Sequence, residues 1–172
     1  MFRMMSETIY PLFRGIPRAY AHINGSEKYP GIKGMVLFYP YENGTVVVAD
    51  IGGLPMTQGS MPAGGTSSGA SQTGPILGFH IHEGFVCSGN ETDPFANAGM
   101  HYSKEPMQHP EHSGDMPVLF VNQGKAWMAF FTDRFTADEV RGRTVIVHAM
   151  PDDFRTNPAG NAGERIACGV IR

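Results

Sequence analysis

Six of the seven histidines in this chain lie at spacings that suit metal binding. Two form a His-x-His pair within Gly-Phe-His-Ile-His-Glu, three lie in a stretch that ends at an aspartate, and one follows the apolar run Thr-Val-Ile-Val. Imidazole is the usual protein ligand for zinc and copper, so the first question is whether these side chains converge. The six are His80, His82, His101, His109, His112 and His148, and only His22 lies outside the pattern.

The His-x-His pair predicts two ligands for one ion. Residues i and i+2 of a strand point to the same side, so His80 and His82 would present both imidazoles to one point. Two unrelated surface histidines would give the same pattern, but the other four histidines favour a site. His148 ends an apolar segment, and on its own it would more often be a satisfied core residue.

A second ligand group follows further along the chain. His109, His112 and Asp115 are three residues apart, and His101 lies eight residues upstream. Three imidazoles and one carboxylate make the closed tetrahedral shell that structural zinc prefers, although a solvated polar loop is the alternative. Two ions with four protein ligands each need more donors than these residues supply. One imidazole that used both ring nitrogens would resolve the shortfall, and His101 is the candidate because it lies between the groups.

The composition bounds the class of protein. A chain of 172 residues is one domain by length. With a net charge of −3, 17% charged residues and no basic block, nucleic acid and membranes are not expected partners. The first twenty residues hold no apolar run of signal-peptide length, which predicts a cytoplasmic location, and no later segment approaches a transmembrane span.

The elements that must position the ligands read as strands. Twenty-two glycines and 13 prolines with few helix-favouring runs indicate an all-β fold. The uncharged segment 52–75 predicts a mobile surface loop, and Thr136 to Val140 a single helical turn capped by Thr136 with Glu139 three residues on. The irregular stretch 84–116 is too long for a structureless loop unless something, such as a metal, orders it. About eight strands are expected, at 19–24, 32–39, 44–51, 76–83, 118–122, 126–132, 144–148 and 166–171.

The two cysteines, Cys87 and Cys168, fit no Cys-x-x-Cys motif. They form either a single disulfide or two buried thiols. A disulfide would tie the start of the irregular stretch to the last strand, and the chain-entropy model gives it about 4 kcal/mol.

The motifs together resemble one family. Gly-Phe-His-Ile-His-Glu, Asn-Ala-Gly-Met-His, His-Pro-Glu-His-Ser-Gly-Asp, Gly-Arg-Thr-Val-Ile-Val-His and Gly-Asn-Ala-Gly-Glu-Arg-Ile-Ala-Cys-Gly-Val-Ile are similar to those of copper/zinc superoxide dismutases of the bacterial type. The resemblance implies an eight-stranded Greek-key flattened barrel, related to immunoglobulin-like sandwiches, with long metal-binding and electrostatic loops. It covers residues 19–172 as one domain and leaves residues 1–18 as an N-terminal extension.

The resemblance also implies roles for individual residues. Arg165 would attract superoxide beside the copper, Asp152 would link a copper-ligand histidine to a zinc-ligand histidine, and Cys87 would form an intrasubunit disulfide with Cys168. The implied copper ligands are His80, His82, His101 and His148, and the implied zinc ligands are His101, His109, His112 and Asp115.

The implied activity is disproportionation of superoxide to O₂ and hydrogen peroxide. Copper would cycle between Cu(II) and Cu(I), and His101, anchored by zinc, would carry a proton. Superoxide dismutases are a standard example of electrostatic steering, so the resemblance also implies a cationic funnel. Glu164 beside Arg165 departs from this, and Arg155 or Lys104 are candidates to offset it. A copper-delivery module and a structural, zinc-stabilised sandwich are the alternative functions.

Other residues near the ligands carry weaker signals. Met100, Met107 and Met150 suggest thioether copper handling, with ordinary packing as the favoured interpretation because no Met-x-x-Met cluster lies near the ligands. Trp127 is expected in the core or at a subunit contact. A homodimer is compatible with the resemblance, but no apolar surface strip in the sequence indicates one.

Overall fold

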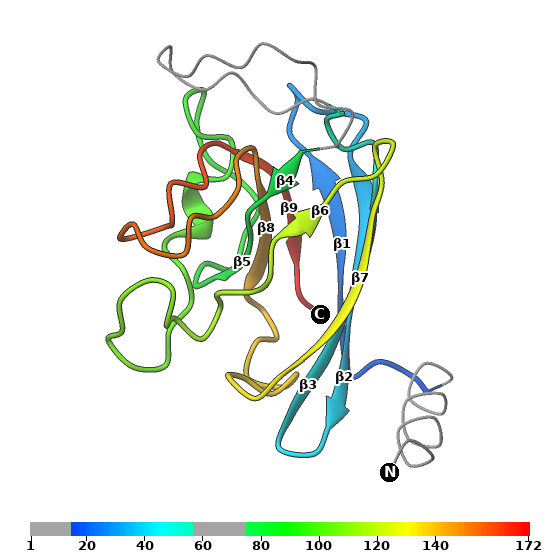
Figure 1. Cartoon of the computed structure of the whole chain (residues 1–172), viewed down its shortest axis with the longest axis vertical. Coiled ribbons are helices and arrows are strands. Elements are labelled where there is room, and N and C mark those ends of the chain that lie inside the picture. Colours follow the sequence, from blue (N-terminus) through cyan, green and yellow to red (C-terminus); the bar gives the residue numbers. More distant parts are fainter. Residues whose placement is uncertain (1–14, 57–74) are drawn as a thin grey trace.

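A computed structural model of the chain describes residues 15–56 and 75–172, and it shows a curled antiparallel sheet with long loops on one side (Figure 1). One sheet has the order β5-β8-β9-β1-β2-β3-β7, and β4 pairs with β6. The strands are β1 Ala19–Gly25, β2 Lys33–Tyr41, β3 Gly44–Gly52, β4 Ile76–Leu77, β5 Phe79–His82, β6 Leu119–Phe120, β7 Ala126–Thr132, β8 Thr144–His148 and β9 Arg165–Val170, and a short 3₁₀ helix, η1 Ala96–Ala98, lies between β5 and β6. The predicted all-β fold is confirmed.

The β4–β6 pair closes the sheet into a flattened barrel. Strands β5 and β7 are the edges of the larger sheet. Gly78 alone separates β4 from β5, and a turn where Asn122 pairs with Lys125 leads from β6 to β7. The predicted strand 76–83 is therefore split in two at Gly78, where an added Cβ would lie only 2.8 Å from the Cβ of Ala162. The other predicted strands occur within a few residues of their expected bounds, and the Greek-key barrel is confirmed.

Side-chain alternation explains which faces are buried. In β1, Ala19, Ala21 and Ile23 point into the core while the residues between them are exposed, as expected for a strand with one wet face. Strands β5 and β8 are instead buried at every position. Their inner residues join the main core, and their outer residues, including His80 and His82, lie under the loops.

Two long connections cover the outer face of β5 and β8, one running from β5 to β6 and the other from β8 to β9 (Figure 1). Phe95 and Ala98 of the first connection pack with Ile146 and Cys168 in a small second hydrophobic cluster. Cys87 forms a disulfide with Cys168, with Cα atoms 5.7 Å apart. The disulfide is confirmed, and together with this cluster it anchors the first half of the stretch that was expected to need an ordering element such as a metal.

Three local predictions have different outcomes. A single helical turn was predicted from Thr136 to Val140, and residues 137–142 form turns. Thr136 and Glu139 make the expected reciprocal hydrogen bonds, from Thr136 N to Glu139 Oε2 (2.6 Å) and from Glu139 N to Thr136 Oγ1 (3.4 Å). Trp127 is 62% exposed on β7, so its predicted place in the core is wrong, and a subunit contact stays a prediction. The loop prediction for 52–75 falls largely on residues outside the described ranges, as does most of the predicted extension 1–18.

Within residues 15–56 and 75–172, no helix combines the length and hydropathy needed to cross a bilayer.

Candidate metal centre

The six histidines converge on the outer face of β5. Pairing between β5 and β8 places His80 opposite Ile146, two residues before His148 at the end of β8. The rings of His80 and His148 have centroids 4.9 Å apart, and those of His80 and His101 are 4.0 Å apart. Strand pairing therefore brings together ligands that are far apart in the sequence.

The free edge of β5 positions the remaining ligands. The loop after β5 returns along this edge, so that His82 bridges to His101 and His80 bridges to Asp115. Ile81 fixes the register, because its N–H donates to Gly114 O at 2.9 Å and its carbonyl accepts from the N–H of residue 102 at 2.8 Å. An added Cβ at Gly114 would overlap the carbonyl oxygen of Ile81. Glycine is needed there because two backbones approach closely.

Two sets of donors result from this arrangement. In each set the candidate ligand atoms all lie within 4.8 Å of one another, and His101 belongs to both sets. One set is His80, His82, His101 and His148, and the other is His101, His109, His112 and Asp115, and these are the two sets that the resemblance implies.

Backbone carbonyls fix the tautomers of His82 and His148. His82 Nδ1 lies 2.9 Å from Gly99 O, and His148 Nδ1 lies 3.2 Å from Gly163 O. A carbonyl only accepts, so each Nδ1 carries the proton and each Nε2 presents its lone pair. Burial lowers the pKa of His148 to about 3. Burial, and after it the neighbouring imidazole of His148, holds the pKa of His82 well below its ordinary value. Both rings are therefore neutral.

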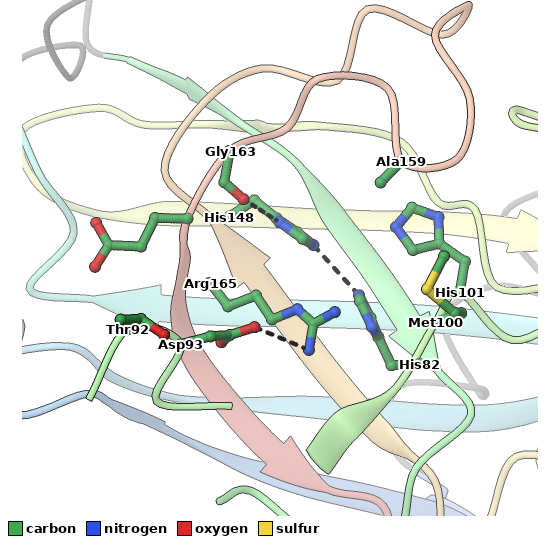
Figure 2. A pocket seen from close by; sticks show the side chains of 10 residues that line it. His82, Thr92, Asp93, Met100, His101, His148, Ala159, Gly163 and Arg165 are labelled. Carbon is green, nitrogen blue, oxygen red and sulfur yellow. Dashed lines mark hydrogen bonds and ion pairs between the residues drawn. The ribbon is translucent and has the colours of Figure 1, made fainter. Parts of the chain in front are cut away.

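The two Nε2 atoms then face each other 3.3 Å apart (Figure 2). Neither has a proton to donate, so the contact brings two lone pairs together in a buried place. Such an arrangement is unfavourable by itself and suits a cation held between the two nitrogens. The donor set therefore fits a metal ion.

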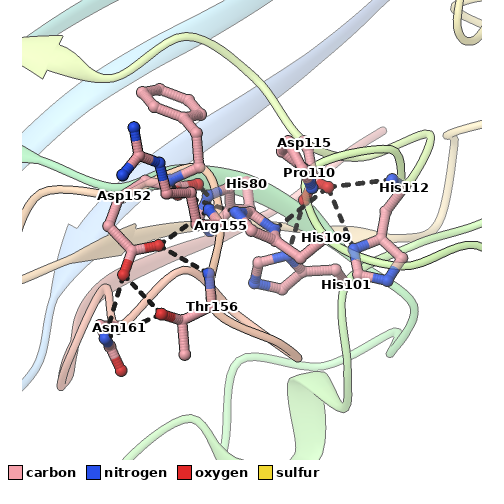
Figure 3. Close-up of polar contacts among 12 residues, drawn as sticks. His80, His101, His109, Pro110, His112, Asp115, Asp152, Arg155, Thr156 and Asn161 are labelled. Atoms are coloured by element: carbon pink, nitrogen blue, oxygen red, sulfur yellow. Dashed lines mark hydrogen bonds and ion pairs between the residues drawn. The ribbon is translucent and has the colours of Figure 1, made fainter.

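Asp152 orients one histidine of each set. Its Oδ2 accepts from His80 Nε2 at 2.7 Å and its Oδ1 accepts from His109 Nε2 at 2.8 Å, and all three side chains are buried (Figure 3). The opposite Nδ1 atoms of both rings are buried without a hydrogen-bond partner. Carboxylates in this position fix the tautomer and orientation of ligating histidines, so both lone pairs are directed into the two donor sets.

Asp115 lies among three imidazoles in the second set. Its carboxylate oxygens are 2.7 Å from His101 Nδ1, 3.2 Å from His109 Nδ1 and 3.0 Å from His112 Nδ1. The contacts with His109 and His112 do not have hydrogen-bond geometry, since both nitrogens lack a partner. Burial would raise the pKa of Asp115, but His101 and the other two imidazoles outweigh it and hold the pKa below its ordinary value. An ionised carboxylate with three nitrogens suits zinc.

His101 joins the two sets. Its Nδ1 faces Asp115, while its Nε2 is buried without a partner on the side of the first set. The side chain is 1% exposed. Each ring nitrogen of His101 therefore faces a different donor set, which is the arrangement that one shared imidazole requires.

Arg165 lies beside the first set at a cavity of about 330 Å³ (Figure 2). Its Nη1 donates to Phe95 O at 2.8 Å and its Nη2 donates to Gly99 O at 2.8 Å. The side chain is 17% exposed. Met100 also lines this cavity and is 48% exposed, and ordinary packing stays the prediction for this methionine.

The charge expected to offset Glu164 comes from a different residue. Lys28, in the connection between β1 and β2, lies 2.7 Å from Glu164 Oε2. Lys104 pairs instead with Glu139, and Arg155 has no contact with Glu164 among the interactions of the described residues. The sequence prediction was wrong on this point, because Lys28 lies 136 residues away and no local pattern links the two.

Two further residues that support the second set were not found from the sequence. Arg134 Nη1 donates to the carbonyl oxygens of Pro110 at 2.8 Å and His112 at 3.2 Å. Asn157 Oδ1 accepts from the backbone N–H of His109 at 2.8 Å. Both lie far from the ligand loop in sequence, and a single polar residue in a loop gives no signal of such a contact.

Comparisons with known proteins agree with this geometry. A family model described as copper/zinc superoxide dismutase matches residues 32–171. The chain is 31% identical over 159 residues to superoxide dismutase [Cu-Zn] of Deinococcus radiodurans, covering 82% of this chain and 78% of that protein. It is 32% identical over 136 residues to superoxide dismutase [Cu-Zn] of Photobacterium leiognathi, covering 71% of this chain and 79% of that protein.

A solved structure supports the fold. A double mutant of a SOD-like protein from Bacillus subtilis superimposes with a TM-score of 0.65 at 24% identity, covering 87% of this chain and 94% of that one. At this identity the likeness concerns the fold alone.

Proposed function

The chain belongs to the copper/zinc superoxide dismutase family, and from this premise we propose which residues of the enzyme hold each metal and the substrate. As a member, it is an oxidoreductase that uses copper and zinc to convert superoxide to O₂ and hydrogen peroxide. In our proposal the copper ligands are His80, His82, His101 and His148, and the zinc ligands are His101, His109, His112 and Asp115.

The observation that carries the copper assignment is the pair of opposed lone pairs on His82 and His148. The Nε2 atoms lie 3.3 Å apart with both protons on Nδ1. The unpartnered Nδ1 of His80 and Nε2 of His101 belong to the same donor set. All-nitrogen sets suit copper, whereas the set with Asp115 suits zinc.

Bound copper would supply the one-electron chemistry by cycling between Cu(II) and Cu(I). The chain itself supplies binding, orientation and a proton. Arg165 is the residue that would bind the superoxide anion, since its guanidinium lies at the cavity and is held by two carbonyls. His101 would hold and release a proton at Nε2, because its Nδ1 faces the zinc set.

The donors of the copper set are buried and border solvent at the cavity. His80, His82 and His148 are at most 3% exposed, and the cavity that Arg165 lines also borders His82, His101 and His148, so an anion in it would lie next to Arg165 and the copper set. Asp152 would keep the two sets in a fixed relation, because one carboxylate holds a histidine of each.

The test is His148→Ala, with His22→Ala as the matched control on β1. His22 is exposed and lies outside both donor sets. We expect His148→Ala to lose copper and superoxide turnover while it keeps zinc, measured by metal analysis and by superoxide consumption. The copper assignment is wrong if His148→Ala keeps copper and the parent's rate. If the parent itself takes up zinc but no copper after copper loading, a structural zinc site is favoured.

Assembly and location stay predictions. A homodimer and a cytoplasmic location would be tested by sedimentation of the purified protein and by fractionation of cells that produce it.

A further inference from the structure

The guanidinium of Arg165 contacts a carboxylate as well as the two carbonyls. Asp93 Oδ2 lies 3.4 Å from Arg165 Nη1, and both residues line the same cavity (Figure 2). The carbonyls of Phe95 and Gly99 fix the position of Arg165 without neutralising it. Asp93 therefore brings an opposite charge to the group that would bind superoxide.

Asp93 is held in place by its own loop. Its Oδ1 accepts from the N–H of Phe95 at 3.0 Å, and its own N–H donates to Asn90 Oδ1 at 2.9 Å. Asn90 Oδ1 also accepts from the N–H of Thr92 at 3.0 Å and from its hydroxyl at 2.7 Å. Only Oδ2 is left to face Arg165. The contact thus comes from a fixed turn rather than from a freely moving surface side chain.

The charges around the cavity are balanced. Its ionic lining residues are Asp93, Glu164 and Arg165. Glu164 pairs with Lys28 at 2.7 Å outside the cavity lining, so the two pairs leave no net charge at the rim. The cationic funnel implied by the family resemblance is therefore not built from these residues.

We propose that Asp93 determines anion specificity at this site, as a tethered carboxylate that competes with incoming anions for Arg165. The proposal rests on the assignment of Arg165 as the anion-binding residue. An anion that pairs with the guanidinium must first displace Asp93 Oδ2. This displacement is a stronger barrier to weakly attracted or bulky oxyanions than to the small superoxide ion. Asp93 acts through Arg165 and is not itself a catalytic residue.

The main test replaces the carboxylate by its isosteric amide. Asp93→Asn removes the charge but keeps an oxygen that can accept from the N–H of Phe95. Because Asp93 is 38% exposed, solvent screening limits the effect, and we expect a roughly threefold to tenfold rise in the second-order rate at low salt. The inhibition constant of inorganic phosphate should fall by a larger factor than the superoxide rate rises, because Asp93 opposes the bulkier oxyanion more strongly. Calorimetric titration of phosphate gives a second measurement that does not depend on turnover.

The matched control is Glu91→Gln. Glu91 is exposed in the same loop and does not line the cavity, so this variant removes the same formal charge without touching Arg165. We expect it to leave the rate and the phosphate constant close to the parent's values. If the two variants have equal effects, the loss of one negative charge explains the result and the proposal is overturned. An unchanged phosphate inhibition constant in Asp93→Asn would also overturn it.

Arg165→Ser separates this inference from the proposed function. If Arg165→Ser keeps the parent's rate, the assignment of Arg165 fails. If Arg165→Ser lowers the rate, the Asp93→Asn effect should disappear in the double variant. A full effect there would show that Asp93 acts without Arg165 and would overturn the inference alone. Should Asp93→Asn not fold, Asp93→Ser replaces it, because its hydroxyl can still cap the turn.

Discussion

A single methyl group at Gly160 should disrupt the link between the two donor sets. Gly160 lies in the connection between β8 and β9 with φ +61°, against the Asp152 carboxylate. A Cβ there would overlap Asp152 Oδ1 and lie 2.7 Å from His109 Nε2. Gly160→Ala must therefore move Asp152 away from His109 or move the loop.

The magnitude has two parts. The left-handed backbone conformation costs a non-glycine residue about 1 kcal/mol. Loss of a carboxylate that orients a ligating histidine typically lowers metal affinity by about 10- to 100-fold, or about 1.4–2.7 kcal/mol. The first part acts on folding stability and the second on metal affinity, so two measurements separate them.

Gly142→Ala is the matched control. Gly142 also has a positive φ, +86°, but an added Cβ would meet nothing closer than Phe85 Cδ1 at 3.5 Å. It should therefore carry the backbone cost without the clash.

Zinc affinity would be measured by competition with a chromophoric chelator, and unfolding free energy by urea titration of the metal-free protein. We expect both variants to lose stability, but only Gly160→Ala to lose zinc affinity. Parent-like zinc affinity in Gly160→Ala would refute the role given to Asp152. Equal zinc losses in both variants would do the same.

Two further predictions concern the loops that carry the ligands. Replacing both Cys87 and Cys168 by serine should lower the unfolding free energy by about 4 kcal/mol, because the bridge closes a loop with a sequence separation of 81; a loss below about 1 kcal/mol in urea titrations would contradict this. Arg134→Ala should lower zinc affinity by about threefold to tenfold, since its two hydrogen bonds to the ligand loop are exposed. Arg141→Ala, another exposed arginine, is its control, and an equal zinc loss in both would remove the role of Arg134.

Local sequence patterns were enough to predict where the strands lie. Alternation of buried and exposed residues in β1, and the apolar run of β8, follow from the two-residue period of an extended chain. The same period placed His80 and His82 on one face of β5. Gly78 was missed as a break because its role is to leave room for Ala162, which approaches from the connection between β8 and β9.

The ligand sets were also predictable, though partly by resemblance. Spacing alone grouped His109, His112 and Asp115, and the count of donors pointed to His101 as the shared residue, which the geometry of both donor sets supports. The pairing of Cys87 with Cys168 was open from spacing and was decided by resemblance before the structure confirmed it.

By itself the sequence determined which residues can bind metal, because the chemistry of imidazole and the two-residue period of a strand are local properties. Only the tertiary structure decided which charges surround them. Lys28 reaches Glu164, and Asp93 reaches Arg165, because the loops of the barrel return to the same rim. The strength of an ionic contact depends on the distance between the charges in space, and distance along the chain does not determine it.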